Sequence, residues 1–330
     1  MKTVLVLGSN SFFGSYFVDL LLGETDWRVI GTSRSVEKPA LFLQYKLRPD
    51  LSRFTFRRID LNADMRVLKE LLAREKPSAV VNFAAQSEAS ASWTNPEQWL
   101  RTNALAVAEL GSFLKDQPWL ERYVHISTPE VYGAREGAVR EDAPVDPGTP
   151  YAASKAAGDL FLAALVKKFK FPLITIRATN VYGPRQQLFK LIPRAAICLK
   201  LARKIELPGG GPSVKSYLHV RDASRGVLAA LEKGRPGQTY HFSADAGVAE
   251  RDVVARLCRL MGRDFAASTV AAAERPDPDE ACAIDSSKAR SELDWRPRIG
   301  LDEGLKQVVD WVERHWKEIW KQPLEYQHKP

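Results

Sequence analysis

The sequence predicts an α/β fold with a doubly wound parallel sheet, followed by a smaller C-terminal α/β unit. Three observations support this prediction. Strand and helix patterns alternate through the first half, the expected strands are continuous apolar runs, and a glycine-spaced turn follows the first of them. Continuous apolar strands that alternate with helices are typical of a parallel sheet covered by helices on both faces. With 330 residues, the chain is long enough for one large or two modest domains.

The expected elements follow one another in a regular order up to about residue 177. Short apolar runs predict strands at residues 4–7, 28–32, 54–60, 79–83 and 123–127. Helical spacing of apolar residues predicts helices at 15–22, 67–74, 96–114 and 151–169. Farther along, the alternation is less regular, and proline and glycine cluster at 208–212 and 276–278. We therefore expect a first domain over 1–178, to which segments near 216–245 return, and a second that occupies most of 179–330.

Composition narrows the class of protein. Apolar residues make up 45% of the chain, but no apolar run approaches about 18 residues, so we expect no membrane span. Cys198, Cys258 and Cys282 show no CxxC spacing and no disulfide framework, which favours a reducing cytoplasm. The net charge of +8 is scattered, so we expect no nucleic-acid partner. Two interpretations of this charge stay open: a basic surface without a polyanionic partner, or a site for a phosphorylated small molecule.

The turn after the first expected strand has the spacing of a nucleotide-binding loop. Its sequence is Gly8-Ser9-Asn10-Ser11-Phe12-Phe13-Gly14, and a helix is expected to begin within it. Glycines allow a tight turn and close approach of the backbone to a pyrophosphate, and the helix N-terminus offers N–H donors. Ser11 stands where a middle glycine is usual. In this strand–turn–helix context we predict a Rossmann-type dinucleotide site with contacts from Gly8, Asn10, Ser11, Phe12, Phe13 and Gly14.

The end of the second expected strand bears on the choice of dinucleotide. An NAD site usually places an acidic residue there, which accepts a hydrogen bond from the ribose 2′-hydroxyl. This chain has Thr32-Ser33-Arg34-Ser35 instead. A guanidinium binds phosphate oxygens bidentately, so Ser33 and Arg34 favour NADP, with NAD as the alternative. Asp60 and Leu61, after the third expected strand, are predicted to lie beside the adenine.

A second set of residues is typical of proton-transfer chemistry. Tyr151 and Lys155 are four residues apart at the start of an expected helix and so share one face. A nearby ammonium is expected to lower the pKa of a phenol, which otherwise lies near 10. Thr128 and Glu130 follow the fifth expected strand, where ligands bind in open α/β sheets. We expect Thr128 to bind a substrate hydroxyl and Glu130 to remove an acidified C–H proton.

These motifs, in their order and spacing, resemble the extended short-chain dehydrogenase/reductases, and among them the nucleotide-sugar 4,6-dehydratases of the dTDP-glucose and GDP-mannose kind. The matching segments are residues 8–14, 60–61, 83–87, 127–133, 151–155, 180–184 and 190–193. The resemblance implies that residues 1–178 bind the dinucleotide and that the second domain binds a sugar nucleotide. It adds cofactor contacts at Phe83, Ala84, Ala85 and Ser87, and also at Tyr151 and Lys155. It implies substrate contacts at Ser87, Glu88, Thr128, Asn180, Lys190, Leu191, Lys215 and Arg275.

Two departures from the family pattern bear on the reaction. Pro129 stands where the dTDP-glucose dehydratases have an aspartate that protonates the leaving hydroxyl, and Glu88 replaces a frequent histidine. Lys215 keeps the charge of a diphosphate-binding arginine but loses its fork. The leading prediction is a 4,6-dehydratase, with a C4 epimerase or a decarboxylase of the same family as the alternative. A hypothesis from a different functional class stays open as well: a non-catalytic, NAD(P)-binding regulatory protein.

The resemblance also implies an assembly. In relatives, the helices that correspond to 96–114 and 151–169 pair across a two-fold axis as a four-helix bundle. Both segments of this chain are rich in small and apolar residues. We therefore predict a homodimer that binds a nucleotide-diphosphate sugar, with no metal site.

Overall fold

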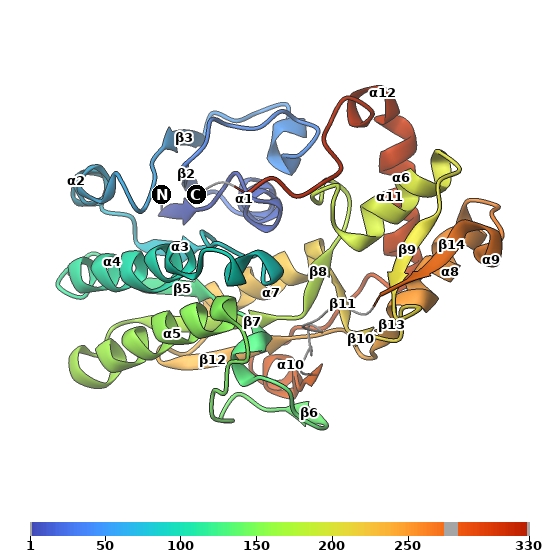
Figure 1. The fold of residues 1–330 in the computed structure, drawn as a ribbon. Helices are drawn as coiled ribbons and strands as arrows, with labels where there is room; N and C mark the ends of the chain where they lie inside the picture. Colours follow the sequence, from blue (N-terminus) through green and yellow to red (C-terminus); the bar gives the residue numbers. More distant parts are fainter. Residues whose placement is uncertain (1, 274–282, 329–330) are drawn as a thin grey trace.

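The computed structural model describes residues 2–273 and 283–328 (Figure 1). Its centre is a seven-stranded sheet in the order β12-β7-β5-β4-β1-β2-β3, in which every neighbouring pair is parallel. The sheet confirms the predicted α/β fold class. Its strands are β1 (Thr3–Leu7), β2 (Arg28–Ser33), β3 (Phe54–Arg58), β4 (Ala79–Asn82), β5 (Arg122–Ile126), β7 (Leu173–Ala178) and β12 (Gln238–Phe242).

Helices cover both faces of this sheet, because the apolar strands send alternate side chains to opposite sides. In β1, Val4 and Val6 join one core cluster while Leu5 and Leu7 join another. The first cluster packs under α1 (Phe12–Glu24), α7 (Val220–Lys233) and α10 (Ser287–Leu293). The second packs under α2 (Met65–Glu75), α4 (Ala106–Leu114) and α5 (Pro150–Phe169). Residues 4–7 of β1 are therefore fully buried on both faces.

The long helix expected at 96–114 is interrupted. It consists of α3 (Pro96–Leu100), the π-helical turn η3 (Arg101–Leu105) and α4. The turn directs the Asn103 amide at the loop after β4: its Nδ2 donates to Gln86 O at 2.8 Å, and Gln86 N donates to its Oδ1 at 2.9 Å. Asn103 Nδ2 also donates to Ser154 Oγ on α5 at 2.9 Å. The irregular turn thus fixes a loop at the carboxyl edge of the sheet, as π-helical turns near functional sites often do.

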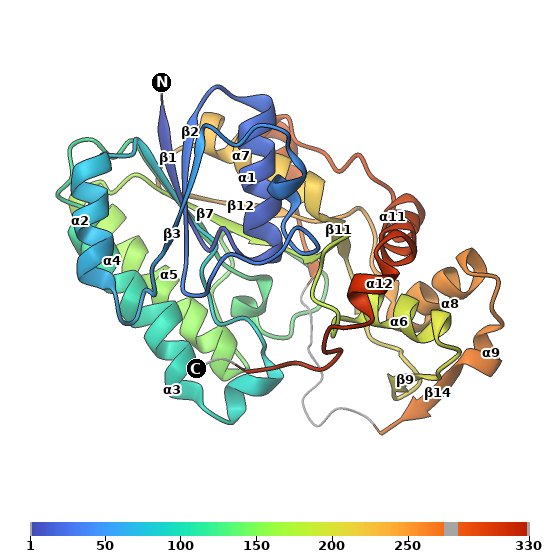
Figure 2. The same cartoon turned by 90° about the horizontal axis from the view of Figure 1, so that it is seen from above.

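A second, smaller group of elements lies beside the carboxyl edge of the sheet (Figure 2). Its core joins α6, α8 and α11 and is separate from the two clusters of the main sheet. The helices are α6 (Leu191–Lys200), α8 (Glu250–Leu260), α9 (Phe265–Ser268), α11 (Leu301–Arg314) and α12 (Trp316–Ile319). The strands pair two by two: β8 (Asn180–Tyr182) with β11 (Tyr217–His219), β9 (Ile205–Pro208) with β14 (Thr269–Ala272), and β10 (Val214–Lys215) with β13 (Val248–Ala249).

The chain crosses between the two groups more than once. After β11 it returns through α7 and β12 to the main sheet, and α10 packs there as well. On this basis we propose the domain division expected from the sequence, with residues near 216–245 in the dinucleotide domain. The remaining elements are β6 (Ala138–Val139), β15 (Ala283–Ile284) and the 3-10 turns η1 (Gln44–Leu47), η2 (Ser90–Trp93) and η4 (Pro129–Tyr132).

Candidate active site

The strand order reverses between β1 and β4, which opens a crevice at their carboxyl ends. Gly8 lies at this crevice with φ of +80°, a left-handed conformation that favours glycine. A Cβ on Gly8 would come within 2.8 Å of Ala84 N, and one on Gly14 would overlap the carbonyl oxygen of Gly8. The glycines therefore let the turn lie directly against the loop after β4.

Ser11 has a local role that accounts for its departure from the glycine pattern. It is the N-cap of α1, and its hydroxyl accepts a hydrogen bond from Gly14 N at 3.0 Å. Asn10 reaches across to the loop after β2, where its Nδ2 donates to Ser35 Oγ at 2.9 Å and its Oδ1 accepts from Lys38 N at 2.8 Å. These bonds fix the loop that carries Arg34.

A pocket of about 300 Å³ lies over these loops. Most of the predicted cofactor residues line it: Gly8, Asn10, Ser11, Ser33, Arg34, Asp60, Leu61, Phe83, Ala84, Ala85 and Ser87. Phe12 and Phe13 line the neighbouring pocket instead, and Gly14 lies beneath the turn. The sequence argument missed further wall residues, namely Lys38, Asn62, Thr102, Gln187, Phe189, Tyr326 and Gln327.

A second pocket, of about 430 Å³, adjoins the first and shares Ser87 and Gln187 with it. It contains most of the predicted catalytic and substrate residues, which come from distant parts of the chain: Ser87, Thr128, Glu130, Tyr151, Asn180, Lys190 and Lys215. Glu88 lines the first pocket, while Leu191 begins α6 and packs against the second domain's core. Arg275 lies outside the described residues.

Tyr151 is held at the floor of the second pocket by the start of α5. Thr149 caps this helix by accepting from Ala152 N at 3.1 Å, and Tyr151 N donates to Ser92 Oγ at 3.1 Å. Burial raises the pKa of the Tyr151 phenol, the negative charge of Glu130 raises it further, and a hydrogen bond with Thr128 opposes both. The sequence predicts a lowered pKa for this phenol; in the structure the pKa is raised instead, because desolvation dominates.

Lys155 lies behind the pocket, almost fully buried. Its Nζ donates to Ile126 O at 2.8 Å and lies 3.4 Å from His125 Nε2. Burial lowers its pKa to about 8; the charge of Asp159 raises it and that of Arg177 lowers it. Burial also lowers the pKa of His125 to about 3, so this imidazole is neutral at pH 7.

A buried polar network supports Lys155 and was not predicted. Asp159 Oδ2 accepts from Ser127 Oγ at 2.7 Å and from Arg177 Nη2 at 2.8 Å, while its Oδ1 lies 3.5 Å from His125 Nε2. Arg177 also donates to the Tyr132 hydroxyl. One signal in the sequence points to it: Asp159 follows Lys155 by four residues and so lies on the same helix face as the Tyr/Lys pair.

Ion pairs hold the two predicted phosphate-binding lysines. Lys190 Nζ lies 2.8 Å from Glu88 Oε2, at the boundary between the two pockets. Lys215 Nζ lies 3.0 Å from Glu250 Oε1, and both side chains are largely buried. The pairing partly neutralises each lysine, and an incoming diphosphate would compete with the carboxylates for them.

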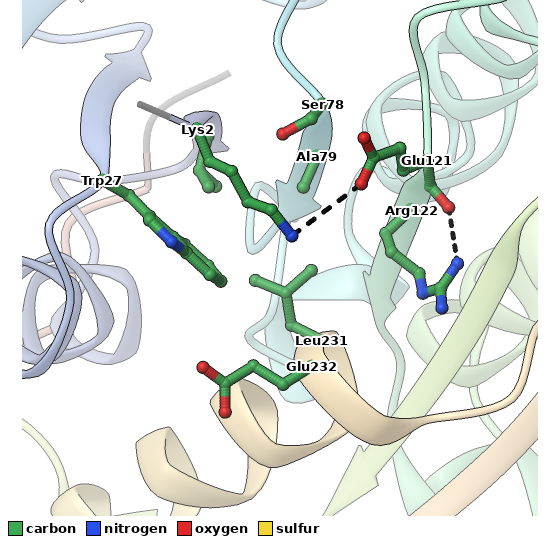
Figure 3. A pocket seen from close by; sticks show the side chains of 9 residues that line it. Lys2, Trp27, Ser78, Ala79, Glu121, Arg122, Leu231 and Glu232 are labelled. Carbon is green, nitrogen blue, oxygen red and sulfur yellow. Dashed lines mark hydrogen bonds and ion pairs between the residues drawn. The ribbon is translucent and has the colours of Figure 1, made fainter.

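The opposite, amino edge of the sheet has a pocket of its own, shown in Figure 3, of about 260 Å³. Its Lys2 side chain lies 3.9 Å from Glu121 and 5.6 Å from the centre of the Trp27 ring. It contains none of the predicted site residues. Within residues 2–273 and 283–328, no group of three His, Cys, Asp or Glu side chains has the arrangement of a metal site, and no helix is long and apolar enough to cross a membrane.

The glycine turn, the Tyr151/Lys155 pair and the adjoining second pocket define an extended short-chain dehydrogenase/reductase. A family model described as GDP-mannose 4,6 dehydratase matches residues 5–308. The chain belongs to this family of nucleotide-sugar dehydratases and epimerases and is an NAD(P)-dependent enzyme.

Individual relatives agree with this assignment. A dTDP-glucose 4,6-dehydratase from Streptomyces niveus is 32% identical over 334 residues, which cover 99% of this chain and 98% of the relative. The structure of DesIV, a dTDP-glucose 4,6-dehydratase from Streptomyces venezuelae with NAD bound, is 30% identical with a TM-score of 0.88, over 98% of this chain and 100% of that one. A UDP-glucuronic acid 4-epimerase from Bacillus cereus, with NAD and UDP-glucuronic acid, is 27% identical with a TM-score of 0.86, over 95% and 99%.

Proposed function

We propose that this enzyme is a nucleotide-sugar 4,6-dehydratase. The observation that carries the proposal is the position of Glu130, a carboxylate in the second pocket whose charge acts on the Tyr151 phenol. A 4,6-dehydration needs a base for the C5 proton as well as a Tyr/Lys pair, whereas a C4 epimerisation needs only the pair. The dTDP-glucose 4,6-dehydratases among the relatives make a dTDP-hexose the first substrate to test.

In the proposed mechanism, the bound dinucleotide supplies a hydride acceptor for C4 of the sugar and a donor for C6. Tyr151 takes the proton of the C4 hydroxyl, which Thr128 orients. Because burial raises the pKa of Tyr151, this transfer needs a positive charge near the phenol, and Lys155 on the same helix face is the candidate. Oxidation at C4 acidifies the C5–H bond, and Glu130 then removes that proton.

Pro129 determines what else Glu130 must do. Pro129 is buried in the first turn of η4 and carries no acidic group to protonate the leaving hydroxyl. Glu130, the next residue, lines the same pocket. We propose that it serves twice: it takes the C5 proton and then passes it to the C6 oxygen, which leaves as water. When hydride returns to C6, C5 regains a proton that comes from solvent.

We further propose that Asn180, Lys190 and Lys215 bind the substrate's nucleotide-diphosphate part, and that the dinucleotide is NADP. The cofactor pocket has Ser33, Arg34, Ser35 and Lys38 at the end of β2 and no acidic side chain in that loop lines it. Two cations and two hydroxyls match a ribose 2′-phosphate better than a 2′-hydroxyl. The NAD-bound relatives make NAD the alternative to be measured beside it.

Isotope transfer tests the reaction. With substrate deuterated at C4, a dehydratase yields a 4-keto-6-deoxy product with deuterium at C6, and in D₂O the product gains deuterium at C5. Glu130→Gln keeps the size of the side chain but removes the base, so the 4-keto sugar and reduced cofactor should accumulate. Glu136→Gln, an exposed position in the same region, is the matched control.

One outcome would replace the proposal with C4 epimerisation. That outcome is a product inverted at C4 that retains its original C5 hydrogen, formed at the same rate by Glu130→Gln. The observation that keeps this alternative open is Pro129 itself, since the pocket lacks a second acid beside Glu130 on η4.

We also propose a homodimer formed through the helices of the α3–α5 layer. Large apolar side chains are exposed there: Leu100, Leu105 and Leu160 are 43%, 65% and 59% accessible. Exposed apolar patches on soluble proteins often mark protein interfaces. Light scattering at micromolar concentration should give twice the chain mass, and a monomeric mass would contradict this assembly.

A further inference from the structure

The segment after α12 does not stay with the second domain. Figure 2 shows residues 321–328 running from α12 back to the side of α3, across the space between the two domains. Burial alternates along it: residues 322, 324, 326 and 328 are half-buried, while 321, 323, 325 and 327 are exposed. A period of two is typical of an extended segment with one face against the protein. We call residues 322–328 the C-terminal strap.

The strap is attached at both ends. On the second domain, Leu324 packs on the core that α6, α8 and α11 share, and Glu325 lies 3.0 Å from Arg194 of α6. On the dinucleotide domain, the His328 ring stacks on Trp99 of α3 with centroids 5.2 Å apart and an angle of 7°. His328 Nε2 also lies 2.6 Å from Gln98 Oε1, at hydrogen-bonding distance. The strap therefore bridges the domains.

The middle of the strap is part of the cofactor pocket wall. Tyr326 and Gln327 line this pocket together with Arg34, Asp60 and Ser87. The Tyr326 ring packs edge-on against Phe189, 5.2 Å between centroids, and its hydroxyl lies 3.0 Å from His328 Nδ1. Burial raises the pKa of Tyr326, the charge of Glu88 raises it and that of Arg34 lowers it, so its hydroxyl lies within the fields of both groups.

We propose that the C-terminal strap is a cofactor-binding element, in which Tyr326 closes the pocket over the bound dinucleotide and His328 holds the strap to α3. Release of the cofactor then requires the His328–Trp99 contact to open. Such retention suits an enzyme whose cofactor takes a hydride and returns it within one turnover, because a reduced cofactor that left would end the cycle. The proposal depends only on dinucleotide binding, so it holds equally for a dehydratase and for an epimerase.

The dissociation rate of the cofactor tests the proposal without any sugar substrate. The full-length protein is loaded with NADPH, or with NADH in a parallel series, and chased with excess oxidised cofactor while nicotinamide fluorescence is followed. Tyr326→Ala/His328→Ala should release the cofactor about tenfold faster, since the variant removes both aromatic contacts, with Phe189 and with Trp99, that hold the strap in place. Lys321→Ala, just before the strap and exposed, should leave the rate unchanged. Tyr326→Phe, which keeps the ring, should release it more slowly than the double variant.

Limited trypsin digestion is a second measurement that needs no variant. Cleavage after Lys321 requires the neighbouring strap to open locally, so saturating cofactor should slow the release of the segment that follows it. An unchanged dissociation rate in a folded double variant would overturn the proposal. Equal cleavage rates with and without cofactor would overturn it as well. Because neither readout involves the sugar, failure here is distinguishable from failure of the proposed dehydration.

Discussion

The two pockets of this enzyme adjoin each other but are held in different ways. The walls of the cofactor pocket come mainly from the loops after β1, β2, β3 and β4, and backbone features such as Gly8 and the Ser11 cap shape them. The second pocket gathers segments from Phe12 to Ile284 and holds its lysines through ion pairs with carboxylates. The backbone that shapes the cofactor pocket already has its binding conformation, whereas the lysines of the second pocket must exchange their carboxylate partners when a diphosphate binds. Substitutions in the two pockets should therefore differ in what they change.

The largest effect on turnover is expected at Tyr151, which lines the second pocket. Tyr151→Phe removes the proton-transfer hydroxyl but keeps the buried ring, so turnover should fall by at least about 10²-fold. Cofactor affinity, measured by titration of the free enzyme, should stay near that of the wild type. Turnover at the wild-type rate would remove Tyr151 from the reaction.

The Lys215–Glu250 pair should separate stability from substrate binding. Lys215→Met leaves a largely buried carboxylate unpaired, which should cost about 3–5 kcal/mol of unfolding free energy in a denaturant titration. Lys215→Met/Glu250→Met should recover most of that stability, because a matched apolar pair is often neutral. Its KM for the sugar nucleotide should still be raised, since the cation is absent. Normal KM in the stable double variant would mean that Lys215 does not contact the diphosphate.

A substitution of Arg34 tests which dinucleotide the cofactor pocket prefers. Arg34→Ala should weaken the binding of NADP by about 1.5–3 kcal/mol, the usual contribution of a hydrogen bond to a charged group, while the affinity for NAD changes little. The two dissociation constants are measured by fluorescence titration. Arg57→Ala removes an exposed cation from the neighbouring strand β3 and is the matched control. A wild-type enzyme that prefers NAD, with Arg34→Ala unchanged, would contradict the NADP assignment.

The smallest effect is expected from the network behind the pockets, and it appears in the pH profile. Lys155 has its pKa lowered to about 8 by burial, so its ammonium is present below that pH and is lost as the pH rises through it. The charge of Asp159 raises this pKa, so Asp159→Asn should lower it further. The alkaline limb of kcat/KM should then move to lower pH, and exposed Asp116→Asn should leave it in place. An alkaline limb that does not move would show that Asp159 does not raise the pKa of Lys155.

The cofactor pocket was the more predictable of the two because its signals are local. The glycine turn, the Ser33–Arg34 strand end and Asp60 each lie within a few residues of an apolar strand, and the parallel sheet brings the strand ends together. The Tyr151/Lys155 pair was predicted for the same reason, from helical spacing. The direction of the Tyr151 pKa was not, because it depends on how deeply the side chain is buried.

Contacts between segments far apart in the chain have no local sequence pattern that predicts them. Nothing near Lys215 in the sequence indicates that Glu250 pairs with it, and nothing near Tyr326 indicates that it lines the cofactor pocket. The interruption of the 96–114 helix was also missed, since the π-helical turn coincides with bonds from Asn103 to distant parts of the chain, at Gln86 and Ser154. These features arise from tertiary packing rather than local preference.

The position of β12 at the edge of the sheet affects how the protein is made. β7 ends at Ala178 and pairs on one side with β5, but its other partner, β12, begins only at Gln238. During synthesis, the whole second-domain segment from β8 to β11 must leave the ribosome before that edge of β7 is covered. Exposed strand edges pair readily with other chains, so the nascent chain has an interval in which aggregation competes with folding. Slow translation between these two strands should therefore lower the yield of soluble enzyme while leaving the finished protein unchanged.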